Sequence, residues 1–140
     1  MRRSGCAFGF SLTAIGTVLL MVSPSTALAE WTYFASLDGD TVLIDRTTLV
    51  QNKNRNSTIW MLTNHGNITV QNVLSVSKWV EFDCDHDKYR YLAVYGYEGQ
   101  MQTGAKLVNI PTPSLWDKTK YGTVLKNLQL VACLRGPLLR

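Results

Sequence analysis

The sequence predicts an α+β domain in which an antiparallel meander of about six strands carries a C-terminal helix on one face, closed by one disulfide. Most of the chain after residue 30 alternates apolar and polar side chains in short runs separated by turn residues, which is typical of strands. The apolar spacing changes to that of a helix only near the C-terminus. Strands first and one helix last favour α+β over a parallel α/β fold.

Residues 1–29 have the pattern of an export signal. Arg2 and Arg3 supply the positive start, residues 7–22 are mostly apolar, and Ala27-Leu28-Ala29 offers the small side chains that signal peptidase accepts. An uncleaved membrane anchor is the alternative, but the apolar stretch is shorter than the roughly 20 residues that span a bilayer. We therefore expect cleavage after Ala29, with Glu30 as the new N-terminus.

The positions of the cysteines also fit an exported protein. Cys6 precedes the apolar stretch, whereas a lipid-attachment cysteine would follow it, so no lipid anchor is expected. Removal of the signal leaves Cys84 and Cys133, which in an exported domain most often pair; two free thiols are the alternative. A bond closing a loop of this length would contribute about 4 kcal/mol in the chain-entropy account.

The mature part reads as one domain, residues 30–133, followed by a flexible tail, residues 134–140, that contains Gly136 and Pro137. Hydrophobic residues make up 46% and charged residues 17% of the chain, which suits a packed core rather than a disordered segment. The positive balance is small once the export signal is removed. This argues against a nucleic-acid partner, which usually requires a concentrated basic patch.

The strands follow in order, each bounded by turn signals such as Asp38-Gly39-Asp40 and Asp85-His86-Asp87. They are expected at residues 31–37, 41–45, 57–64, 75–84 and 88–97, with weaker patterns at 68–73 and 104–110. Within 57–64, Ile59 and Met61 point to one face, and Trp60 and Leu62 to the other.

The helix is expected at residues 124–132. Thr123 opens it, and Val124, Leu128 and Val131 recur at helical spacing. Ser114 has the position of a cap for a separate helical turn. A bond from Cys133 to Cys84 would tie the end of the helix to a central strand.

The sequence lacks the pattern of a known catalytic, cofactor or metal site. Neither Gly-x-Ser-x-Gly nor His-Glu-x-x-His occurs, and both histidines, His65 and His86, lie in expected turns. Residues 83–87, Asp-Cys-Asp-His-Asp, form the densest group of possible ligands, but their spacing matches no calcium loop and favours a solvated turn. We expect a protein that is not an enzyme, with no metal and no cofactor.

Aromatic residues give the strongest indication of a binding surface. Tyr89, Tyr91, Tyr95 and Tyr97 share one parity in a single predicted strand, and Trp79 lies in the strand before it. Tyrosine and tryptophan are enriched where a partner buries a surface, so these five residues are the candidate binding residues. The alternative is that they form core beneath the helix, and parity alone leaves both possibilities open.

Several short segments resemble the surface-adhesin protein E-like family of Gram-negative bacteria. They are Trp31, Val42-Leu43-Ile44-Asp45, Ile59-Trp60-Met61-Leu62, Glu81-Phe82-Asp83-Cys84, Tyr89-Arg90-Tyr91-Leu92 and Leu130-Val131-Ala132-Cys133. The resemblance implies about six antiparallel strands backed by a C-terminal helix, with the two late cysteines bonded. It also implies adhesion to host matrix or epithelial cells without catalysis.

These observations lead to one hypothesis and one alternative. The chain is expected to be an exported, non-enzymatic, adhesin-like module in the periplasm, at the cell surface or secreted, where it recognises a host or envelope protein or glycan surface. The alternative is a periplasmic inhibitor or accessory subunit of an envelope enzyme. A homodimer is compatible with either.

Overall fold

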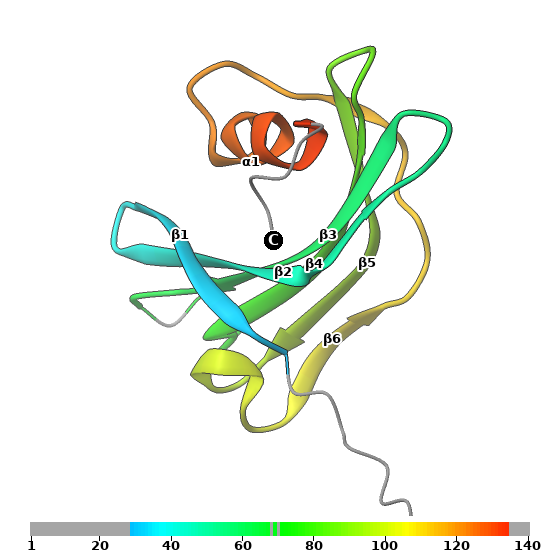
Figure 1. Cartoon of the computed structure of the whole chain (residues 1–140). Helices are drawn as coiled ribbons and strands as arrows, with labels where there is room; N and C mark the ends of the chain where they lie inside the picture. The colour runs from blue at the N-terminus through cyan, green and yellow to red at the C-terminus, as the bar shows by residue number, and fades with distance from the viewer. Residues whose placement is uncertain (1–28, 68, 70, 135–140) are drawn as a thin grey trace, which may run out of the picture.

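The computed structural model describes residues 29–67, 69 and 71–134, which form one antiparallel sheet with a helix on one of its faces (Figure 1). The strands are β1 (Trp31–Leu37), β2 (Asp40–Gln51), β3 (Asn56–Asn64), β4 (Ser75–Asp83), β5 (Lys88–Tyr97), β6 (Lys106–Ile110) and β7 (Asp117–Lys118). The 3-10 turn η1 (Gln100–Gln102) precedes β6, and the helix α1 (Val124–Cys133) comes last. Strands β1 to β6 lie side by side in chain order, and β7 pairs with β5. The predicted fold class is confirmed.

Two predicted segments fall almost wholly outside the described residues. The export signal, residues 1–29, is represented only by Ala29, and the tail, residues 134–140, only by Leu134. Within the described residues, no helix combines the length and apolar character that crossing a bilayer requires.

The core lies between α1 and the face of the sheet that it covers. Alternation in β3 directs Ile59 and Met61 toward the helix, where Leu128 of α1 is fully buried. The buried core consists of Val42, Ile44, Ile59, Met61, Val80, Phe82, Leu128 and Ala132. The helix begins where predicted, because the Oγ1 of Thr123 accepts a hydrogen bond from the backbone N–H of Lys126 at 3.2 Å.

The disulfide joins Cys84, directly after β4, to Cys133 at the end of α1, with the Cα atoms 5.6 Å apart. The predicted pairing is confirmed. The side-chain amide of Gln51 donates to the carbonyls of Ala132 and Leu134, at 2.9 Å each. Carbonyls at a helix C-terminus have no partner within the helix, so β2 and β4 both secure this end of α1.

A bulge in β5 corrects the prediction that four tyrosines share one face. Trp79 pairs with Ala93 but Val80 pairs with Tyr91, so Leu92 is an extra residue in β5. One inserted residue reverses the side-chain parity beyond it. Tyr89 and Tyr91 therefore pack on the covered face with the core, whereas Tyr95 and Tyr97 lie on the opposite face.

Two local predictions were also wrong. The described residues between 68 and 73, which include Thr69 and Asn72, form a turn and loop rather than a strand. Ser114 does not cap a helix; its N–H donates to the carbonyl of Tyr91, and its Oγ accepts from the Tyr91 N–H. Hydrogen bonding to the exposed edge of β5 competes with helix formation at this position.

Candidate aromatic binding face

The face of the sheet opposite α1, here called the free face, carries a row of residues across four strands. Trp31 of β1 is paired with Asp45 of β2, Asp45 with Trp60 of β3, and Trp60 with Trp79 of β4. Residues paired across neighbouring antiparallel strands point to the same face. Three of the four tryptophans of the sequence therefore stand in one line.

The rings on the free face stack on one another. The centroid of Trp60 lies 6.0 Å from that of Trp79 and 5.9 Å from that of Tyr95, with the ring planes within 10° and 21° of parallel. The Nζ of Lys106 lies 4.4 Å from the ring centroid of Tyr95 and 5.7 Å from that of Tyr97. Such cation–π contacts hold the lysine chain against the aromatic stack.

The fourth tryptophan extends the same face toward the other end of β5. The Arg90 guanidinium lies 4.6 Å from the ring centroid of Trp116, and its Nε donates to Glu81 at 2.6 Å. Trp79 and Trp116 are each 38% exposed. Large apolar rings thus reach solvent along much of the free face.

A groove of about 470 Å³ lies beside the stack. Its lining combines the aromatic rings with short polar side chains, and comprises Ala29, Trp31, Asp45, Thr47, Thr48, Trp60, Tyr95, Tyr97, Gln102 and Lys106. Thr47 and Thr48 reach it because β2 departs from regular pairing between Asp45 and Val50. The groove can accept apolar groups along its rings and hydrogen-bonding groups at its threonines.

The covered face uses its tyrosines differently. Tyr91 packs edge-on against Tyr89, with centroids 5.4 Å apart, and the Nζ of Lys78 lies 5.1 Å from the centroid of Tyr91. Burial, with the neighbouring Tyr89, raises the pKa of the Tyr91 phenol, and burial lowers the pKa of Lys78. Tyr89 and Tyr91 therefore lie in the packed layer beneath α1, and only Trp79, Tyr95 and Tyr97 of the predicted set belong to the free face.

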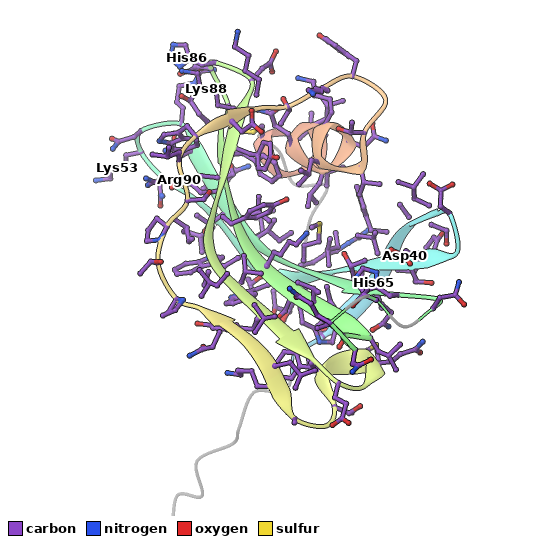
Figure 2. The ribbon with its side chains drawn as sticks, turned by 180° about the vertical axis from the view of Figure 1, so that it is seen from behind. Asp40, Lys53, His65, His86, Lys88 and Arg90 are labelled. Carbon is purple, nitrogen blue, oxygen red and sulfur yellow. A yellow bond between two sulfur atoms is a disulfide. The ribbon has the colours of Figure 1, made fainter. Side chains whose placement is uncertain are left out.

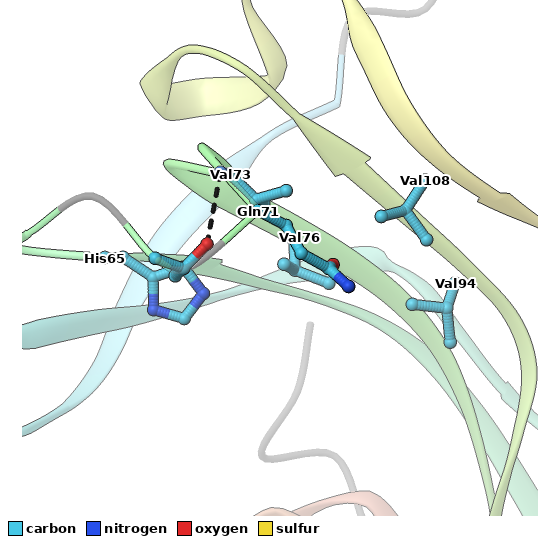
Figure 3. A pocket seen from close by; sticks show the side chains of 7 residues that line it. His65, Gln71, Val73, Val76, Val94 and Val108 are labelled. Atoms are coloured by element: carbon cyan, nitrogen blue, oxygen red, sulfur yellow. Dashed lines mark hydrogen bonds between the residues drawn. The ribbon is translucent and has the colours of Figure 1, made fainter.

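A second, more apolar pocket of about 440 Å³ lies at the sheet end where β3 turns into the loop before β4 (Figure 3). Figure 3 shows His65 on one side of it and Val94 and Val108 on the other. The Nδ1 of His65 lies 2.7 Å from a carboxylate oxygen of Asp40, whose other oxygen accepts from the Gly66 N–H. This pair fastens the start of β2 to the loop after β3.

His86 lies far from His65, at the turn between β4 and β5 (Figure 2). Its Nδ1 lies 2.9 Å from Asp83. Although burial acts to raise it, hydrogen bonds from His86 and from the Asp85 N–H hold the pKa of Asp83 below its usual value. Among the described residues, no group of three or more acidic, histidine or cysteine side chains is arranged to hold a metal ion.

Sequence reasoning missed Trp31, Trp60 and Lys106 as members of the candidate site. A signal for Trp60 was present, because alternation placed it opposite Ile59 and Met61, the pair that packs under the helix. Trp31 and Lys106 lie in the outermost regions of the meander, and they join the site only through strand pairing and the fold of the β5–β6 connection.

The sequence profile of the surface-adhesin protein E family matches residues 31–134. The chain belongs to this family. No curated protein matches it significantly. Family membership indicates an adhesin-like protein that is exported or displayed at a surface.

Solved structures share the fold. One structure of Haemophilus influenzae protein E superposes with a TM-score of 0.55 at 12% identity, covering 66% of this chain and 79% of that one. A second structure of the same protein gives a TM-score of 0.52 at 11% identity, covering 74% of this chain and 92% of that one. The predicted family resemblance is confirmed.

Proposed function

We propose that this member of the family is an exported, non-catalytic module that binds a partner protein through its free face. The observation that carries the proposal is the row of Trp31, Trp60 and Trp79 on the sheet face opposite α1. Tryptophan and tyrosine offer large contact areas while losing few torsional degrees of freedom, so they anchor partners efficiently.

The arrangement of the rings favours a protein over a glycan. A sugar packs best on the open face of an aromatic ring, and here Trp60 is stacked with both Trp79 and Tyr95 while Lys106 lies over Tyr95. Ring edges, tyrosine hydroxyls and one ammonium group suit the mixed side chains of a protein surface, which pairs apolar anchors with scattered hydrogen bonds.

We infer binding without turnover. The two histidines are engaged with Asp40 and Asp83, and neither lines the aromatic groove. The carboxylate in that groove, Asp45, is 3% exposed and accepts hydrogen bonds from neighbouring backbone and Thr47. A general base must reach a substrate proton, and this carboxylate is held away from solvent.

Export through the signal and display at the cell surface complete the proposal. Fractionation of the producing cells, followed by protease treatment of intact cells, tests the location. The chain is expected in the outer-membrane or extracellular fraction and accessible to protease. Recovery only from a protease-protected periplasm would support the alternative of an inhibitor or accessory subunit.

Two matched surface variants test the binding face. Trp79→Ser on the free face and Leu130→Ser on the outer side of α1 both replace exposed apolar side chains, which are 38% and 55% exposed. Beads coated with the processed chain are applied to epithelial cell monolayers. We expect Trp79→Ser to reduce attachment about tenfold, equivalent to about 1.4 kcal/mol, with Leu130→Ser unchanged.

The target class is read from the same assay. Protease treatment of the monolayer should abolish attachment, and enzymatic removal of glycans should leave it. The reverse pattern would assign a glycan target. Equal attachment by both variants and the parent chain would refute the free face as the binding surface.

A further inference from the structure

Asp45 is the one buried charged side chain of the described residues that has no ion-pair partner among them. Three charged residues of the described chain are buried: Asp45 at 3% exposure, Glu81 at 7% and Lys126 at 5%. Glu81 lies 2.6 Å from Arg90, and Lys126 lies 2.6 Å from Asp87. A buried charge is costly unless it is paired, so Asp45 lacks what the other two possess.

The contacts of Asp45 point to where a cation would come from. One carboxylate oxygen accepts from the N–H and the Oγ1 of Thr47, at 3.0 and 2.5 Å. The other accepts from the backbone N–H of Glu30 at 3.3 Å. Within the described part of the chain, that second oxygen has Glu30 as its hydrogen-bond donor.

The nitrogen of Glu30 is the atom that export processing is expected to change. Cleavage after Ala29 breaks the bond from the Ala29 carbonyl carbon to the Glu30 nitrogen. Water supplies a hydroxyl to the carbonyl carbon and a hydrogen to the nitrogen. A free α-amino group has an ordinary pKa of about 7.7–8.0, so at neutral pH it takes up a proton and becomes an ammonium.

We propose that the α-ammonium of Glu30 is the cation that pairs with Asp45, so that signal removal completes the free face. The new charge arises at a nitrogen that already donates to the carboxylate, and the pair secures the start of β1. Trp31 follows directly and is paired with Asp45, so the ion pair holds that ring as a wall of the groove.

Cleavage also alters the groove. Ala29 is one of its lining residues, and processing removes it together with everything that precedes it. The precursor therefore has an amide and a covalently attached segment at the rim, whereas the processed chain has a small charged group. This last consequence rests on the proposed function of the free face, but the ion pair does not.

A double-mutant cycle on thermal stability tests the ion pair without any ligand. Four disulfide-bonded chains are compared, beginning at Ala29 or at Glu30, each with Asp45 or with Asp45→Asn. They are released from a fusion partner by a protease that leaves no extra residue. In the chain that begins at Ala29, the ammonium is one residue away from the Glu30 nitrogen, and the N–H of Glu30 that donates to Asp45 is retained.

With Asp45 present, the chain that begins at Glu30 should melt about 4–8 °C higher than the chain that begins at Ala29. With Asp45→Asn the two should melt together within error. An equal gap in both backgrounds, or no gap with Asp45 present, would overturn the proposal.

Titration of the α-amino group of the Glu30 chain by NMR covers the case in which Asp45→Asn fails to fold. The charged groups nearby are Asp45 and the side chain of Glu30, and Lys106 also lines the groove. A carboxylate partner favours the protonated form, so the amine should titrate above its ordinary value. Titration of the amine at or below its ordinary value would contradict the ion pair, even if attachment to cells depended on Trp79. Conversely, an attachment result would bear only on the proposed function of the free face and would not test the ion pair.

Discussion

The two halves of β5 place tyrosines on opposite faces of the sheet. Before the bulge at Leu92, Tyr89 and Tyr91 pack under α1; after it, Tyr95 stacks with Trp60 on the free face. One inserted residue therefore divides a stripe of four tyrosines into a pair that packs with the core beneath α1 and a half-buried pair on the free face. The comparison shows that the role of an aromatic residue in this sheet depends on register rather than on residue type.

The largest contrast is expected between two aromatic residues of β4 that lie on opposite faces of the sheet. Phe82 is fully buried and Trp79 is 38% exposed. Phe82→Ala should lower the free energy of unfolding by about 3–5 kcal/mol because it leaves a cavity under the helix. Trp79→Ala should cost only about 0.5–1.5 kcal/mol, the value of one stacked pair. Urea denaturation of both variants checks this; equal losses would mean that the free face is also core.

The disulfide provides the next largest effect. Replacing Cys84 and Cys133 together by Ser should lower the free energy of unfolding by about 2–5 kcal/mol, because the bond restricts the unfolded chain between β4 and α1. Its effect on cell attachment should be small under conditions where the variant remains folded, since the bond lies on the covered side. Titration of the denatured, unreduced processed chain, which lacks Cys6, should detect no free thiol, and two free thiols would refute the bond.

The two halves of β5 are compared most closely by Tyr91→Ala and Tyr95→Ala. Tyr91 lies in the packed layer beneath α1, so its loss should cost about 2–3 kcal/mol of stability, less than a fully buried aromatic residue. Tyr95→Ala should cost about 0.5–1.5 kcal/mol and should weaken attachment to cells. Melting curves measured beside attachment assays separate the two effects. If Tyr91→Ala weakened attachment to cells without lowering the melting temperature, the assignment of Tyr91 to the core and Tyr95 to the binding face would be wrong.

These contrasts also show which features a sequence can predict. The meander and the helix were predictable because alternation and the spacing after Thr123 are local signals, and the sequence alone placed Trp60 opposite Ile59. The bulge was not predictable, because Leu92 has no property that marks an inserted residue. The same holds for Asp45, whose burial depends on the approach of Glu30 and on the departure of β2 from regular pairing.

The smallest effect concerns alkaline pH. Burial raises the pKa of the Tyr91 phenol, so the folded chain holds that proton more strongly than the unfolded chain, in which tyrosine ionises near pH 10. The stability that depends on this proton is present below about pH 10 and is lost as the pH rises above it. Tyr91→Phe should therefore flatten the decline in melting temperature above pH 10. An unchanged slope would contradict burial of the hydroxyl.

Site-specific photo-crosslinking measures directly which face meets the partner. A photoreactive phenylalanine analogue is placed at position 79 on the free face or at position 130 on the outer side of α1, and the processed chain is irradiated on intact epithelial cells. A discrete, protease-sensitive adduct is expected from position 79 and none from position 130. Adducts from position 130 alone would show that the helix side is the binding surface, and would refute binding through the free face.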